Sequence, residues 1–180
     1  MTSGRRFPIR YSVQRWNDSV WLYGSLVVVM VILTLIQLLS HKEVLSFLLV
    51  LGVSAAILLI HWILRLTSYL ETGDETLRVR YVLRHVELPY TALTRVRRQP
   101  LEVAFQPAER RRFVNRFVRR LAREPAAYIR LDRRQADLVT QTERRLGPRL
   151  VAGADIVVPI VGVDEFVTEM KSRLRGQPGE

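Results

Sequence analysis

Residues 20–39 read VWLYGSLVVVMVILTLIQLL, and residues 44–64 read VLSFLLVLGVSAAILLIHWIL. Neither run contains a charged side chain. In an α-helix, about 20 apolar residues are enough to cross the hydrocarbon core of a bilayer. A buried helix of a soluble protein could imitate one such run, but two in tandem favour membrane spans. The two runs therefore predict two transmembrane helices, and the rest of the chain is interpreted around them.

The connection between the runs is very short, since only residues 40–43, Ser-His-Lys-Glu, separate them. The helices must then return antiparallel, which leaves both termini on the same side. Positive charge in short flanking segments marks the cytoplasmic side of a membrane protein. The flanks hold Arg5, Arg6, Arg10 and Arg15 before the first run and Arg65, Arg78, Arg80 and Arg84 after the second. We expect an integral plasma- or inner-membrane protein with cytoplasmic N- and C-termini.

Aromatic residues gather near the ends of the runs, as amphipathic rings do at headgroup depth. The expected interfacial anchors are Trp16, Trp21, Tyr23, Trp62 and Tyr69. His61 suggests two hypotheses, a haem ligand or proton relay on one hand and a solvated interfacial histidine on the other. The first apolar run holds no histidine or carboxylate at a matching depth. The solvated interpretation is therefore favoured.

The overall composition is strongly basic, because 28 Lys and Arg stand against 17 Asp and Glu, a net charge of +11. Only Lys42 and Lys171 are lysines. Such an excess favours an anionic partner, either lipid or nucleic acid. The absence of cysteine excludes disulfides, thiolate metal sites and a cysteine nucleophile. The expected organisation is a basic N-terminal segment (1–19), the hairpin (20–64), one cytoplasmic domain (66–176) and a short tail (177–180).

Several stretches after the hairpin alternate apolar and polar residues with period two, which is typical of half-buried antiparallel strands. They are residues 69–72, 77–81, 85–88, 93–97 and 127–132, with one or two further strands in 151–161. Residues 163–175 instead place apolar side chains at spacings of three and four. Asp164 and Glu165 would lie in the first turn of that helix, as its dipole prefers. The pattern predicts a sheet or open barrel closed by a C-terminal helix.

The segment SYLETGDETLRVRYVLRHVELPYTALTRVR (68–97) resembles the opening of the bacterial membrane-flanked PH-like (pleckstrin-homology) domain family. The matching positions are Tyr69 and Thr72, Leu77 and Val79, Leu88-Pro89-Tyr90, and Leu93 with Val96. Residues 163–167, VDEFV, resemble the closing helix of that family. Two departures are that Tyr81-Val82 replace the glycine common in the first hairpin, and that residues 99–125 are long and basic. The resemblance implies a PH-like fold beside the membrane, without a particular ligand.

Residues 107–124 read PAERRRFVNRFVRRLARE, which predicts a basic amphipathic helix. At about 100° per residue, its apolar side chains share one face, namely Phe113, Val114, Phe117, Val118 and Leu121. The opposite face holds Arg112, Arg116, Arg119, Arg120 and Arg123. The apolar face could pack on the sheet while the arginines face water, or the helix could lie on the bilayer surface. A protein or nucleic-acid partner is the third alternative. In each case the arginine face is the expected ligand surface.

No motif of an enzyme is present, since the chain lacks G-x-S-x-G, H-x-x-x-H, a Walker loop and G-x-G-x-x-G. Residues 132–137, DRRQAD, indicate a solvated loop or the start of a helix. We expect no catalytic residues, cofactor or metal, and the lack of a nucleic-acid motif argues against that partner. The expected function is a non-catalytic, membrane-anchored PH-like binding or scaffolding module that presents arginines to anionic lipid headgroups or an acidic partner. The alternative is an accessory or assembly subunit that packs against other membrane proteins.

Overall fold

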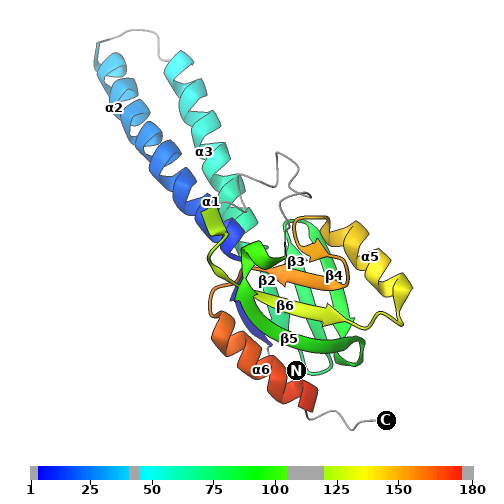
Figure 1. Ribbon diagram of the computed structural model, residues 1–180. Coiled ribbons are helices and arrows are strands. Elements are labelled where there is room, and N and C mark those ends of the chain that lie inside the picture. The colour runs from blue at the N-terminus through cyan, green and yellow to red at the C-terminus, as the bar shows by residue number, and fades with distance from the viewer. Residues whose placement is uncertain (1–3, 41–44, 105–119, 176–180) are drawn as a thin grey trace. The chain divides into compact units, whose positions relative to one another are not determined.

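The computed structural model describes residues 4–40, 45–104 and 120–175. The chain forms two compact units. Ser12–Leu66 makes the first, named here the helix unit, whereas Met1–Tyr11 and Thr67–Glu180 together make the second, the sheet unit. The protein is thus an α+β protein with two long apolar helices and two antiparallel sheets (Figure 1).

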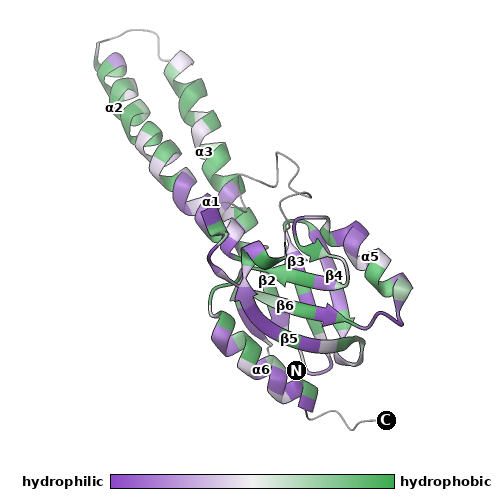
Figure 2. Ribbon diagram, in the orientation of Figure 1, coloured by the Kyte–Doolittle hydropathy of each residue, from purple (hydrophilic) through white to green (hydrophobic). Residues whose placement is uncertain are grey.

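The helix unit is an antiparallel pair of helices. The first helix runs through α1 (Arg10–Ser19), a π-helical turn (Val20–Gly24) and α2 (Ser25–Leu39), and the second is α3 (Leu45–Leu66). Both are long and apolar enough to cross a membrane. In the most apolar stretch of each helix, 0% of the residues of the first and 6% of the residues of the second are buried. Figure 2 shows apolar residues along α2 and α3. The two predicted apolar helices are confirmed, although the first begins at Arg10 rather than Val20.

The first sheet of the sheet unit combines chain from both sides of the hairpin. Its strands are β1 (Arg5–Pro8), β2 (Tyr69–Thr72), β3 (Thr76–Tyr81) and β4 (Arg84–Pro89), in the order β1-β2-β3-β4. β1 pairs antiparallel with β2, with Phe7 opposite Leu70. Within the predicted N-terminal segment, Arg5–Pro8 thus supplies an edge strand and Arg10 begins a helix. β2, β3 and β4 were predicted, but β1 was not.

The second sheet follows in sequence and has the order β5-β6-β8-β7. Its strands are β5 (Leu93–Pro100), β6 (Pro125–Leu131), β7 (Val151–Ala152) and β8 (Asp155–Val158). Short 3₁₀ turns, Tyr90–Ala92 and Leu101–Val103, precede and follow β5. An isolated bridge between Ile9 and Ile160 links the two ends of the unit. The predicted strands in this half of the chain are confirmed.

The C-terminal helix α6 (Val163–Arg175) has the bounds that the sequence predicts. It packs against β5 and β6 through its apolar face, where Phe166 and Met170 are fully buried. The Phe166 ring meets the Phe7 ring edge-on at 5.2 Å, so the helix also contacts a side chain of β1. Burial of a phenylalanine of this kind stabilises a fold by roughly 1.5–3 kcal/mol. The helix therefore covers a core to which both sheets contribute.

A further helix, α5 (Ala136–Leu146), packs against β4 and β7. The sequence indicated only a loop or helix start at 132–137. The helix buries Thr142 and Leu146, and Leu138 and Val139 pack partly against the core. Gly147, with a φ of 77°, ends it in a conformation that glycine adopts without strain.

Candidate membrane-facing surfaces

The arginine face that the sequence singles out is described only at its end. Arg112, Arg116 and Arg119 lie outside the described residues, whereas Arg120 and Arg123 are exposed. Leu121, from the opposite face of the predicted helix, is buried in the core of the sheet unit. At this end of the segment, an apolar side chain thus faces the core and the flanking arginines face outward.

The chain after Leu121 is held firmly to the end of β5. The Leu101 N–H donates to the Glu124 carbonyl at 3.0 Å, and the Glu102 N–H donates to the Ala122 carbonyl at 2.9 Å. The Glu124 carboxylate also accepts a hydrogen bond from Arg10 at 2.6 Å. This ion pair joins the residue that begins α1 to the residue before β6. Both side chains are about one third exposed or more, so the pair contributes at most about 1 kcal/mol.

The predicted interfacial anchors differ in their environments. Trp21, in the π-helical turn, is 83% exposed, and Trp62 on α3 is 47% exposed. Trp16 and Tyr23 are half-buried. Tyr69 is only 8% exposed, and the Arg6 guanidinium lies 4.7 Å above its ring. A ring covered in this way offers less surface to a lipid headgroup than Trp21 or Trp62 does, and Tyr69 packs within the sheet unit.

His61 has a partner that the sequence did not reveal. Its Nδ1 lies 2.9 Å from the Ile57 carbonyl oxygen, and the Arg15 Nε–H group lies 3.1 Å from its Nε2. A carbonyl oxygen only accepts and an arginine only donates, so one neutral tautomer satisfies both contacts, with the proton on Nδ1. The histidine therefore links the two helices of the helix unit. No spacing rule finds this pair, because Arg15 and His61 belong to opposite arms of the hairpin.

The outward face of the first sheet carries paired charges. Arg6 contacts Glu71 at 3.2 Å, and Arg78 contacts Glu87 at 2.7 Å and Glu71 at 3.7 Å. The hydrogen bond to Glu87 and the negative charge of that carboxylate raise the pKa of Arg78. These arginines are already neutralised by neighbouring carboxylates, so they add little attraction for an external anion.

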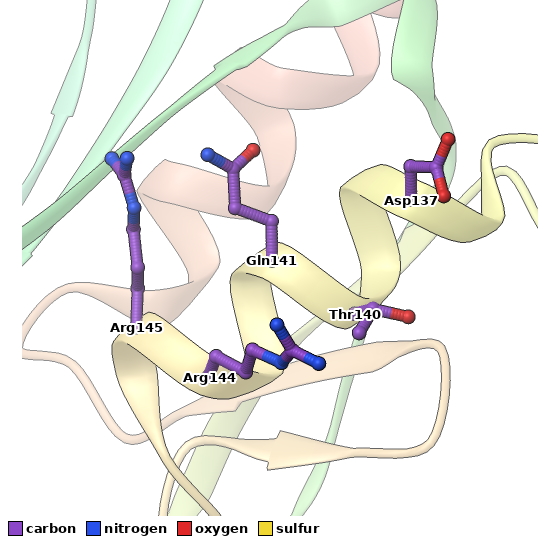
Figure 3. A pocket seen from close by; sticks show the side chains of 5 residues that line it. All are labelled: Asp137, Thr140, Gln141, Arg144 and Arg145. Atoms are coloured by element: carbon purple, nitrogen blue, oxygen red, sulfur yellow. The ribbon is translucent and has the colours of Figure 1, made fainter.

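A shallow hollow of about 400 Å³ lies on α5 (Figure 3). It is lined by Asp137, Thr140, Gln141, Arg144 and Arg145, all of them exposed. In Figure 3, the Gln141 and Arg145 side chains extend from successive turns in the same direction. Small-molecule sites are usually enclosed and largely apolar, so this polar hollow is not proposed as one. Among the described residues, no group of three or more His, Asp or Glu side chains could hold a metal ion.

Comparison of the chain with protein-family models, with curated proteins and with solved structures finds no match. The surfaces described above must therefore be interpreted from their own chemistry.

Proposed function

We propose that the protein is a membrane-anchored, PH-like binding or scaffolding module of the plasma or inner membrane, with both termini in the cytoplasm. Its helix unit crosses the bilayer, and its sheet unit presents arginines to anionic lipid headgroups or an acidic partner. The proposed role is non-catalytic: the module holds an interaction surface close to the cytoplasmic leaflet.

One observation carries the proposal, namely that β1 and β2 pair although the whole helix hairpin lies between them in sequence. A transmembrane hairpin returns the chain to the side of the membrane on which it started. A sheet with one strand from each flank can form only if both flanks lie on that same side. The uncovered apolar side chains of α2 and α3 also favour a lipid environment, because soluble proteins rarely expose large contiguous apolar surfaces. The basic flanks then favour the cytoplasmic side.

The PH-like assignment is supported by the arrangement of strands and of the closing helix. The two four-stranded antiparallel sheets enclose one hydrophobic core, and α6 packs over it. The β3–β4 turn holds Val82 at a φ of 59°, so a glycine-like conformation is kept where the family commonly has glycine. The exposed arginines Arg120 and Arg123 support the anionic ligand, since each arginine near an anionic leaflet contributes about 1 kcal/mol.

The membrane topology can be tested cleanly because the chain has no cysteine. Single-cysteine variants Ser40→Cys and Ser172→Cys would be treated in intact cells with a membrane-impermeant maleimide. We expect labelling of S40C from outside, and labelling of S172C only after permeabilisation. Labelling of both from the same side would contradict the proposed hairpin.

The arginine surface can be tested with the full chain in lipid nanodiscs. A fluorophore at Ala122→Cys, beside Arg123, would be quenched by spin-labelled lipid in anionic discs. Replacing Arg116, Arg119, Arg120 and Arg123 by Gln should remove the quenching. A control that replaces Arg95, Arg133, Arg134 and Arg175, all exposed, removes equal charge and should preserve it. Equal loss of quenching in both variants would show that the attraction depends on total charge and not on this surface. If detergent extracts the protein only together with other proteins, the alternative of an accessory subunit is favoured.

A further inference from the structure

The β3–β4 hairpin ends in an exposed apolar turn. Tyr81 pairs with Arg84, so Val82 and Leu83 alone form the turn. Val82 adopts a φ of 59°, which a β-branched residue rarely does. Leu83 is 82% exposed, among the most exposed large apolar side chains of the described sheet unit. The tight turn holds Leu83 outward, where nothing in the described chain covers it.

This turn lies beside the segment that leaves the helix unit. In the register of β2 and β3, Tyr69 is opposite Arg80, so the turn extends just past the first residue of β2. The Val82 N–H donates a hydrogen bond to the buried Ser68 hydroxyl at 3.1 Å. Ser68 follows the last residue of α3, Leu66, by two positions. The turn is therefore hydrogen-bonded to a residue only two positions after the end of α3 in the sequence.

Arginines lie on both strands next to the turn. Arg80 and Arg84 flank it, and the Arg84 guanidinium reaches the Arg145 carbonyl at the end of α5, at 3.5 Å. Within the described ranges, no ion pair to a carboxylate involves Arg80, Arg84 or Arg145. The sheet-face arginines Arg6 and Arg78, by contrast, are paired with glutamates. We name Leu83, Arg80, Arg84 and Arg145 the turn cluster.

Other side chains place a further cation in the same neighbourhood. Tyr11, at the start of α1, is buried, and burial together with the nearby Tyr81 phenol raises its pKa. The positive charge of Arg149 acts in the opposite direction and lowers the pKa of Tyr11. Tyr81, which immediately precedes the turn, and Arg149 both act electrostatically on Tyr11. This end therefore combines one apolar side chain with several cations.

An exposed apolar side chain with arginines on the adjoining strands fits the headgroup layer of an anionic bilayer. Such a layer accepts an apolar group at the acyl boundary and attracts arginines through its phosphates. We propose that the turn cluster is a lipid-contact surface, in which Leu83 enters the interface and Arg80, Arg84 and Arg145 bind anionic headgroups of the membrane that holds α2 and α3. This inference rests on the proposed membrane anchorage, but it does not require the arginine face at 112–123.

The test uses the full chain in nanodiscs whose lipids carry a spin-label quencher at headgroup depth. An environment-sensitive fluorophore would be placed at Leu83→Cys, or at Glu75→Cys in the exposed β2–β3 turn at the opposite end of β3. In anionic discs we expect a blue shift and quenching at L83C, and neither at E75C. In an R80Q/R84Q/R145Q background, the quenching at L83C should be largely lost, and raised salt should weaken it by screening.

Three results would overturn the inference. The first is quenching at L83C no stronger than at E75C. The second is equal quenching in neutral and anionic discs, which would remove the role of the arginines. The third is protection of L83C from an aqueous quencher without quenching by lipid, which indicates a contact between copies of the chain. Hydrogen exchange of β3 and β4 would verify folding in each variant. The S40C topology result separates failure of this surface from failure of the membrane anchorage itself.

Discussion

Thr72 on β2 donates a hydrogen bond to the Glu169 carboxylate on α6 over 2.6 Å. The same carboxylate oxygen accepts from Arg173 at 3.1 Å, and Arg173 also donates to the Gly73 carbonyl. The Tyr90 hydroxyl donates to that carbonyl as well, at 2.7 Å. Because Thr72 is fully buried, its hydroxyl has little access to water. This polar cluster fastens the closing helix to the first sheet.

The first prediction concerns this contact. Thr72→Val keeps the shape of the side chain but removes its donor, so we expect a loss of about 1–2 kcal/mol in the free energy of unfolding of the sheet unit. Hydrogen exchange at β2 and α6 amides should rise accordingly. Thr168→Val is a matched control, since Thr168 is exposed and its hydroxyl, within the described part of the chain, donates to the Asp164 carbonyl of the same helix. If the two changes lower the free energy of unfolding equally, the hydrogen bond between Thr72 and Glu169 adds no stability beyond that of an exposed hydroxyl.

The second prediction concerns the β3–β4 turn. A non-glycine residue in the left-handed region costs roughly 1–2 kcal/mol, whereas glycine costs about 0.5–1 kcal/mol of chain entropy. Val82→Gly should therefore leave stability unchanged or raise it slightly. Leu83 has no such strained backbone for glycine to relieve. Leu83→Gly therefore adds only the entropic cost and should lower the stability of the sheet unit. Thermal unfolding of both variants gives the ranking, and a V82G variant less stable than L83G would mean that Val82 side-chain packing outweighs the strain.

The third prediction concerns the tautomer of His61. The contacts to Ile57 and Arg15 require a proton on Nδ1 and a free Nε2. Nitrogen chemical shifts of selectively labelled histidine, measured on the reconstituted full chain, should show this pattern. Arg15→Gln, whose amide is shorter, should remove the constraint and destabilise the helix pair by about 0.6 kcal/mol. An Nε2-protonated ring in the unmodified chain would be incompatible with the Arg15 contact.

The fourth prediction is a loss of stability in alkali. Burial is the main cause that raises the pKa of both Tyr90 and Tyr128 above the ordinary value of 10.0. In the unfolded chain these phenols ionise near pH 10.0, while in the folded chain they stay neutral to a higher pH. The stability they contribute is therefore complete below pH 10.0. It is lost as the pH rises from there through the raised pKa of the folded state.

Tyr128→Phe tests the alkaline effect. At neutral pH the variant should lose about 1 kcal/mol, because the Tyr128 hydroxyl donates to the Pro100 carbonyl at 2.6 Å. Above pH 10.0 its disadvantage should shrink, since phenylalanine does not ionise. Unfolding measured across this range gives both values. A gap that stays constant with pH would show that Tyr128 ionises as readily folded as unfolded.

The sequence predicted the elements whose pattern is local. Alternation found β2, β3 and β4, and spacings of three and four found α6, because each of these elements displays its buried face within its own residues. α5 carried a comparable signal in Leu138, Val139 and Leu146, but the charged residues 132–137 before it favoured a loop. β1 could not be found in this way. It is four residues long, contains Pro8, and pairs with a strand on the far side of the hairpin.

Among the candidate surfaces, too, only those with a local sequence pattern could be predicted. The helical wheel predicts a basic amphipathic helix over 107–124, and most of that segment lies outside the described residues. The turn cluster was not predictable, because the contact between the Arg84 side chain and the Arg145 carbonyl depends on the packing of α5 on β4. Tyr69 looked like an anchor because it follows an apolar helix, but the stacking of Arg6, from β1, depends on the strand that the sequence did not reveal.

The pairing of β1 with β2 also sets an order of events during biosynthesis. A ribosome releases Arg5–Pro8 before either apolar helix and Tyr69–Thr72 only after both. The edge strand must therefore wait, without its partner, while both helices of the hairpin are made. Only then can the first sheet form and Phe7 reach Phe166. If the hairpin is transmembrane, as proposed, completion of the sheet unit would report that both helices have crossed the bilayer. A chain in which only one of the two helices crossed would leave β1 and β2 on opposite sides of the membrane, and the unpaired strands would be exposed to quality-control proteases.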